Sequence, residues 1–417
     1  MDHTNSEGMS LLPEYSPPPL SGRAGAPEYS GSSLVLMGDT IVYSSVESSS
    51  PTIRFVTPGR QTHIIHVTSH SADGCTQITA LSLDQSTPCS YSRYIRLASF
   101  LSTGEFSVFS VDQHSLVASS RLLAYLPSHR TERTAPIIQA AYHHPILLTL
   151  SQGFALSIYD LSDHGKVKRT QTLSSFTSYP PTSIILSPSH GTRGVLKVVL
   201  VFSVPVYPRH WSVGVTELLI KLGDDLGGTF ASPSLISTRT VRTFDLPLRW
   251  IDENQLKVIQ EQWGRKVEKV ADTQTDGKWV VLAPLSVSAS PSYRRNRLTS
   301  FSNALQQYRL TLPPTPSAGT PKLTFVRYLY GSESDVEKIW VADGRCVSLS
   351  TDGGIWVWDL EERPQGDKGS NESMWLEGAQ VEIGDDVSWK GRGSVVFDER
   401  RIATVRGGGV ELRRFDV

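Results

Sequence analysis

The chain has 417 residues, of which 39% are hydrophobic and 19% charged, so it can bury one large core or several small ones. Its 40 lysines and arginines balance 41 aspartates and glutamates, and the formal net charge of −1 disfavours nucleic acid or an anionic membrane as a partner. Three scattered cysteines, Cys75, Cys89 and Cys346, do not form a disulfide framework, and no Cys-x-x-Cys pair is present. We therefore expect a reducing compartment and no cofactor.

The first residues lack the basic start and the apolar stretch of a signal peptide. The longest apolar runs, such as Val198–Phe202, are far too short to span a bilayer. We expect a cytoplasmic or nuclear protein that makes no membrane contact.

Residues 1–33 are rich in proline, serine and glycine and have no apolar period, which predicts a disordered arm. Within this arm the sequence Leu12–Ser16 (LPEYS) recurs as Ala26–Ser30 (APEYS). A proline followed by a tyrosine, as in Leu12–Tyr15, resembles the ligands of WW-type domains, which makes such a domain a candidate partner. An ordinary tail is the simpler interpretation, because such short motifs are common.

The rest of the chain consists of short apolar runs separated by Gly, Pro, Asp and Asn, a texture that predicts many antiparallel strands. Residues 252–263 are the exception. Asp252 could cap a helix with Leu256 and Trp263 on one face, whereas the alternation of Leu256 and Val258 fits a strand. Both interpretations stay open for this insertion.

Residues 346–360 predict an alternating strand, an Asp-Gly turn and a second strand that ends in Trp358-Asp359. Phe109, Tyr159 and Phe415 end weaker copies of this pattern. Hairpins that repeat in this way indicate the blades of a β-propeller, which recur about every 40–50 residues. The longer interval between Tyr159 and Trp358 requires long insertions between strands.

The predicted fold class is all-β, a seven-bladed β-propeller of four-stranded antiparallel blades that occupies residues 34–417. The blades are expected at residues 34–67, 78–122, 137–173, 182–242, 248–329 and 336–381, with the seventh ending at Val417. A ring of blades must seal its ends or leave strand edges exposed. Because the last blade stops at its third strand, Ser33–Leu36 is the expected closing strand.

Ser348, Asp352 and Trp358 stand at the spacing found in WD-repeat proteins, so the chain resembles a divergent member of that family. The resemblance implies that Trp358, followed by Asp359, is buried and shares a hydrogen-bond network with Ser348 and Asp352. A family histidine that would complete this network is missing, since Gly331-Ser332 stands in the place of Gly-His.

The resemblance implies a non-enzymatic scaffold that binds a partner protein through its loops. An alternative is the substrate receptor of a ubiquitin ligase, although residues 1–33 leave no room for the F-box that usually precedes the propeller. Aromatic and arginine residues on the longest insertions are the expected contacts, because such residues dominate protein interfaces. These candidates are Trp211, Tyr293, Arg294, Arg295 and Arg297.

The arginine cluster around Arg295 could hold phosphate or an acidic partner, or it could be a solvated loop. Thr299 and Ser300 just downstream would make it a substrate of a basic-directed kinase.

Sequence signals for catalysis or metal binding are weak. His63, His66, His70 and Cys75 lie close together, but residues three apart on a strand point to opposite faces, so we expect no metal site. The motifs of serine hydrolases, P-loop proteins and zinc proteases do not occur. A propeller hydrolase remains a third alternative, which would need paired carboxylates at the ring centre.

Overall fold

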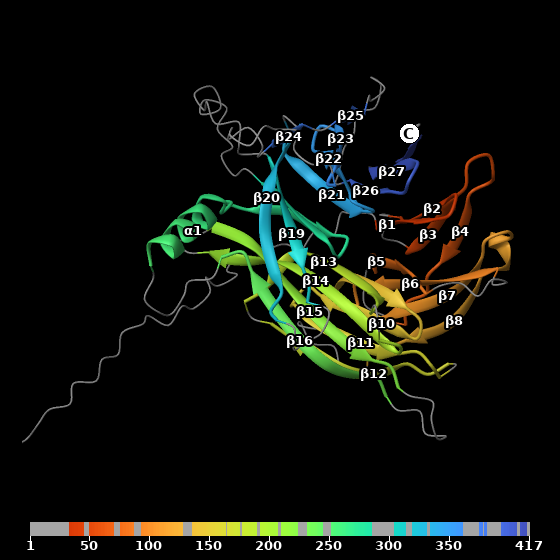
Figure 1. Cartoon of the computed structure of the whole chain (residues 1–417). Helices are drawn as coiled ribbons and strands as arrows, with labels where there is room; N and C mark the ends of the chain where they lie inside the picture. Colours follow the sequence, from red (N-terminus) through yellow and green to blue (C-terminus); the bar gives the residue numbers. More distant parts are fainter. Residues whose placement is uncertain are drawn as a thin grey trace, which may run out of the picture.

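The chain forms a ring of small antiparallel sheets (Figure 1). The computed structural model describes residues 33–45, 50–70, 76–86, 93–127, 136–163, 165–175, 177–189, 192–206, 210–223, 232–244, 252–285, 304–313, 319–331, 334–361, 375–377, 379–381, 393–406 and 409–414. The predicted arm therefore lies outside the described residues except for Ser33, as does its Leu12–Tyr15 motif.

The first four blades each contain four strands in sequence order. They consist of β1 (Leu34–Met37), β2 (Thr40–Ser44), β3 (Thr52–Val56) and β4 (His63–His66); β5 (Ile78–Leu83), β6 (Tyr94–Leu101), β7 (Phe106–Asp112) and β8 (Ser120–Tyr125); β9 (Ile137–His143), β10 (Ile146–Ser151), β11 (Ala155–Asp160) and β12 (Lys168–Ser174); and β13 (Tyr179–Pro188), β14 (Val195–Val206), β15 (His210–Lys221) and β16 (Ser234–Arg242). A short 3₁₀ turn, Leu116–Ala118, follows β7.

The last three blades are less regular. The fifth contains β17 (Val270–Thr275), β18 (Trp279–Pro284), β19 (Leu305–Thr311) and β20 (Lys322–Tyr330), and β24 (Trp375–Glu377) joins its outer edge in parallel. The sixth contains β21 (Val336–Ala342), β22 (Arg345–Ser350), β23 (Ile355–Asp359) and β25 (Ala379–Val381). In the described residues the seventh has three strands, β26 (Ser394–Phe397), β27 (Arg401–Arg406) and β28 (Gly409–Arg414). The predicted seven-bladed propeller is confirmed.

Residues 252–264 settle the alternative that the sequence left open. They form a helix, α1 (Glu253–Gly264), because Asp252 and Gln255 make a reciprocal capping box at its start. The fifth blade therefore begins at Val270 and not at residue 248. No helix in the described part of the chain is long and apolar enough to cross a membrane.

The buried apolar residues of the described chain form seven clusters, and each cluster lies between two adjacent blades. Leu148 of the third blade, for example, shares a cluster with Val198 of the fourth. Each blade thus buries its two faces against its neighbours, which is how repeat folds are stabilised.

The expected mechanism of ring closure is wrong. The strand that starts at Leu34 pairs with β2 as the innermost strand of the first blade and does not complete the seventh. Among the described residues the first and seventh blades meet through side chains, because Leu34 and Tyr43 pack with Val396 and Val405 of the seventh blade. On the surface, Arg401 Nη1 lies 2.6 Å from the Asp39 carboxylate.

We expect Leu34→Ala to destabilise the ring by about 2–5 kcal/mol, because Leu34 is 6% exposed and its removal leaves a cavity at the closing seam. Leu126→Ala, at a position 53% exposed, is the matched control and should change stability by less than about 0.5 kcal/mol. Urea unfolding followed by circular dichroism measures both. Equal midpoints for the two variants would contradict closure through this cluster.

Candidate protein-interaction surface

One face of the ring carries the largest insertions. In a meander of four antiparallel strands, the turn between the second and third strands and the links between blades emerge at the same end. In the fourth and fifth blades these are the β14–β15 turn, the link that contains α1, and the connection from β18 to β19. Two of these connections are long, the link that contains α1 and the connection from β18 to β19, and the β14–β15 turn is short. Figure 1 shows α1 outside the ring of blades.

Trp211 connects two of these segments. It lies in β15, not in a loop, and exchanges two backbone hydrogen bonds with Val267, of 2.7 and 2.9 Å. Its half-buried ring packs edge-on against Tyr179 at 5.5 Å between centroids. Trp211 therefore fixes the end of the α1 segment on the fourth blade, while part of its side chain stays accessible.

Helix α1 is attached through its C-terminal half. The ring of Trp263 lies 5.4 Å from that of Phe244, which follows β16, and the Lys266 ammonium lies 3.8 Å above the Trp263 ring. The apolar surface of the helix is only partly used, because Leu256 and Val258 are 47% and 51% exposed. Leu256 lies seven residues before the half-buried Trp263 and therefore on the same side of the helix, where the two residues form a surface that a partner can cover.

The insertion with the predicted arginines is anchored beside the same helix. Leu285 donates its backbone N–H to Lys269 at 2.9 Å, and Gln306 Nε2 donates to the Arg265 carbonyl at 2.8 Å. Both ends of the connection from β18 to β19 therefore meet residues 265–269. Tyr293, Arg294, Arg295 and Arg297 themselves lie outside the described residues.

We call this surface the blade 4–5 platform and define it as Trp211, Phe244, α1 and residues 265–269. Sequence analysis selected Trp211 but missed α1 as a contact element, because the helix could not be separated from a strand by its periodicity alone. The capping pair Asp252 and Gln255 was the signal that could have identified it.

Trp358 has a different role from the one implied by the WD-repeat resemblance. It is 2% exposed, but its Nε1–H donates to the Tyr330 carbonyl of the fifth blade at 2.9 Å and not to Ser348. The Ser348 hydroxyl is buried and has no hydrogen-bond partner among the described residues. Asp352 accepts hydrogen bonds from the Gly354 N–H and the Ser334 hydroxyl. The tryptophan thus joins two blades, where the family network would stabilise one.

The residues after Trp358 strengthen the same seam. The buried Arg327 of the fifth blade donates to the Asp359 carbonyl at 3.1 Å, and Gln307 Nε2 donates to the Leu360 carbonyl at 2.9 Å. Gly331 permits the close approach of the blades, because a Cβ there would lie 2.4 Å from the Trp356 ring. Trp358 and Asp359 therefore take part in the seam between the fifth and sixth blades.

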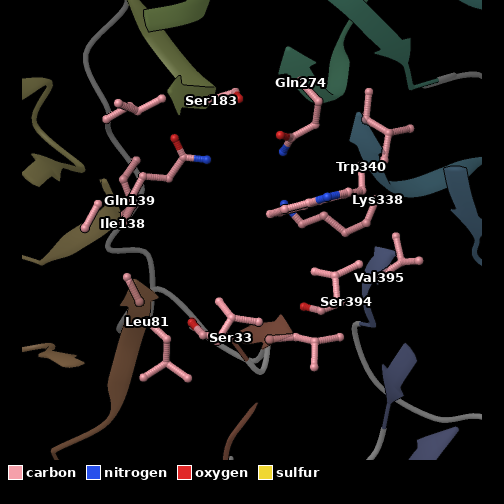
Figure 2. A pocket seen from close by; sticks show the side chains of 17 residues that line it. Ser33, Leu81, Ile138, Gln139, Ser183, Gln274, Lys338, Trp340, Ser394 and Val395 are labelled. Atoms are coloured by element: carbon pink, nitrogen blue, oxygen red, sulfur yellow. The ribbon is translucent and has the colours of Figure 1, made fainter. Parts of the chain in front are cut away.

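The central channel is lined by residues from the innermost strands of all seven blades (Figure 2). Its cavity of about 200 Å³ contains Lys338 as the only charged residue among those that line it, and none is a carboxylate. Paired carboxylates, the requirement for a glycosidase, are thus missing from this lining. In the described residues no three His, Cys, Asp or Glu side chains converge on a metal site.

Two substitutions distinguish the observed hydrogen bond between Trp358 and Tyr330 from the network with Ser348 that the WD-repeat resemblance implies. Trp358→Phe should cost about 1–3 kcal/mol, because the buried Tyr330 carbonyl loses its donor. Ser348→Ala should be neutral or stabilising, because it removes a buried hydroxyl without a partner. The urea midpoints of both variants measure these changes. If Ser348→Ala lowers the midpoint as much as Trp358→Phe does, Ser348 takes part in the hydrogen-bond network that the family resemblance implies.

Solved structures with a similar fold have low sequence identity. They include a chain of the "Crystal Structure of Mitotic Checkpoint Complex" (11% identity, TM-score 0.47, covering 93% of this chain and 90% of that chain). Others are the WD40 β-propeller domain of Doa1 (11%, 0.42, 92% and 92%) and Saccharomyces cerevisiae Sqt1 (8%, 0.45, 92% and 94%). No curated protein sequence matches the chain.

A family model gives the decisive comparison. The model described as "F-box protein pof12 beta-propeller" matches residues 28–392, which cover most of the chain and six of the seven blades in full. The match agrees with the divergent WD-like character of the repeats. The chain therefore belongs to the F-box protein pof12 β-propeller family.

Proposed function

We propose that this propeller is a non-enzymatic protein-recognition domain that binds its partner through the blade 4–5 platform. The observation that carries the proposal is the convergence of two long connections beside β15, held together by Trp211, Arg265 and Lys269. A protein interface needs a rigid frame beneath adaptable contact residues, and the propeller supplies that frame.

The platform has the composition of an interface. Leu256 and Trp263, seven residues apart on one side of α1, provide an apolar centre, and Lys266 and Lys269 provide a basic border. Interfaces commonly combine a buried aromatic anchor with a polar rim. These features fit a partner segment that offers an apolar side chain with acidic residues beside it.

We further propose that the partner is a substrate for ubiquitination. The support is membership of a family named for an F-box protein, since F-box propellers act as the substrate-receptor half of ubiquitin ligases. The scaffold and the receptor hypotheses share the platform and differ in what happens to the bound protein. Nothing in the channel lining favours the third alternative, a propeller hydrolase.

Charge introduced into the platform should abolish partner binding. We expect Leu256→Asp to reduce the proteins captured by the full-length chain more than tenfold, because a carboxylate at the apolar centre must be desolvated without a counterion. Ile236→Asp, at a position 53% exposed on β16, is the matched control. Quantitative mass spectrometry of crosslinked complexes provides the measurement. If both variants lose the captured proteins equally, or if neither variant loses them, the interface lies elsewhere.

The ligase role has its own test. The full-length protein should co-purify with ubiquitin-ligase core subunits after crosslinking, and depletion of the protein should raise the steady-state level of the platform-dependent partners. If those partners bind but neither ligase subunits nor changed protein levels are found, the scaffold hypothesis replaces the receptor hypothesis.

A further inference from the structure

The wall of the central channel presents hydrogen-bond donors to one space. Gln139 of the third blade, Gln274 of the fifth and Lys338 of the sixth all point into the centre in Figure 2. They come from the innermost strands β9, β17 and β21. Their convergence depends on the ring, because they are far apart in the sequence.

The orientation of Gln139 is fixed by its neighbour. Its Oε1 accepts a hydrogen bond of 3.2 Å from the Thr182 hydroxyl of the fourth blade. A side-chain amide has one acceptor and one donor end, so the bond to Thr182 leaves the NH₂ group for the channel.

Lys338 is the charged residue of the channel lining, and its counterion, the buried Asp272, is not part of that lining. The ammonium is 3.6 Å from Asp272 Oδ1, and the Lys338 side chain is 46% exposed while that of Asp272 is 1% exposed. The Asp272 carboxylate accepts the N–H groups of Thr273 and Ile339, at 3.0 and 3.1 Å, and a side-chain hydrogen bond from Gln274. Burial raises the pKa of Asp272, and the Lys338 ammonium opposes that rise. A ligand in the channel therefore meets the ammonium and not the carboxylate.

The remaining wall is apolar or carries small hydroxyls. Leu34, Leu81 and Val395 also line it, and Trp340 lies beside Lys338 in Figure 2. A cavity of about 200 Å³ can hold several water molecules or one short side chain. One ammonium and the neutral Gln139 amide match a single negative charge on a short apolar stem, whereas phosphate would require more cationic groups.

We propose that the central channel binds the carboxylate of an aspartate or glutamate side chain from a partner peptide. The proposal extends the proposed function, because it assigns a second and chemically defined contact to the same protein partner. A free dicarboxylate shares this chemistry and is distinguished by experiment.

The test uses the full-length protein and a library of random 12-residue peptides. Peptides retained by the wild type are resynthesised with each acidic residue replaced by its amide, and their affinities are measured by fluorescence anisotropy. We expect one position at which the amide weakens binding at least tenfold. The ratio of the affinity of the acidic peptide to that of its amide counterpart should fall to about one in Lys338→Gln. It should be retained in Lys338→Arg, because the preference for the acid comes from a single contact between a cation and the carboxylate.

Two further variants control for stability and location. Gln139→Glu tests the channel without removing Lys338, the counterion of the buried Asp272. The new carboxylate should weaken the binding of the acidic peptides more than tenfold by charge repulsion. Lys322→Gln, at an exposed position on β20 outside both the platform and the channel, should leave the ratio unchanged. Melting temperatures of all variants verify that the ring is intact.

Several results would overturn the proposal. These are a library that yields no retained peptide, retained peptides without an acidic preference, and an unchanged ratio in Lys338→Gln or Gln139→Glu. Glutarate that binds by calorimetry while no peptide does would assign the channel to a small dicarboxylate instead. If the ratio is absent but Leu256→Asp still abolishes partner capture, the channel proposal fails and the proposed function stands.

Discussion

The structure depends on the apolar contact between adjacent blades, and above all on the contact that closes the ring. Leu34 and Tyr43 of the first blade pack with Val396 and Val405 of the seventh, although more than 350 residues separate them. Without a strand shared between the two blades in the described residues, side-chain burial has to hold them together. The cost of loop closure grows slowly with length, so one such cluster can join distant parts of a chain.

The seam between the fifth and sixth blades uses polar contacts in addition to apolar ones. The Trp358 indole, the Arg327 guanidinium and the Gln307 amide all donate to backbone carbonyls across it. Buried donors need acceptors, and the carbonyls at the ends of β20 and β23 supply them. Loss of the family histidine has therefore not left the indole without a partner.

Much of the fold could be predicted because strand patterns are local. The alternation in residues 346–360 and the Asp-Gly turn depend on neighbouring residues. Five of the predicted blades start within three residues of an observed first strand. The start of the fifth blade was wrong, because the local pattern of residues 252–263 fits both a helix and a strand. Trp211 was selected for its residue type, and its bridging role to Val267 could not be foreseen.

The sequence alone determined the number of blades, their approximate bounds and the absence of common catalytic motifs, because these follow from periodicity and composition. Only the tertiary structure decided which residues meet. It placed Leu34 in the first blade, gave Trp358 a partner in the neighbouring blade, and brought Gln139, Gln274 and Lys338 to one channel. Such contacts join distant parts of the chain, and their geometry depends on how seven twisted sheets pack in a ring, which no local pattern encodes.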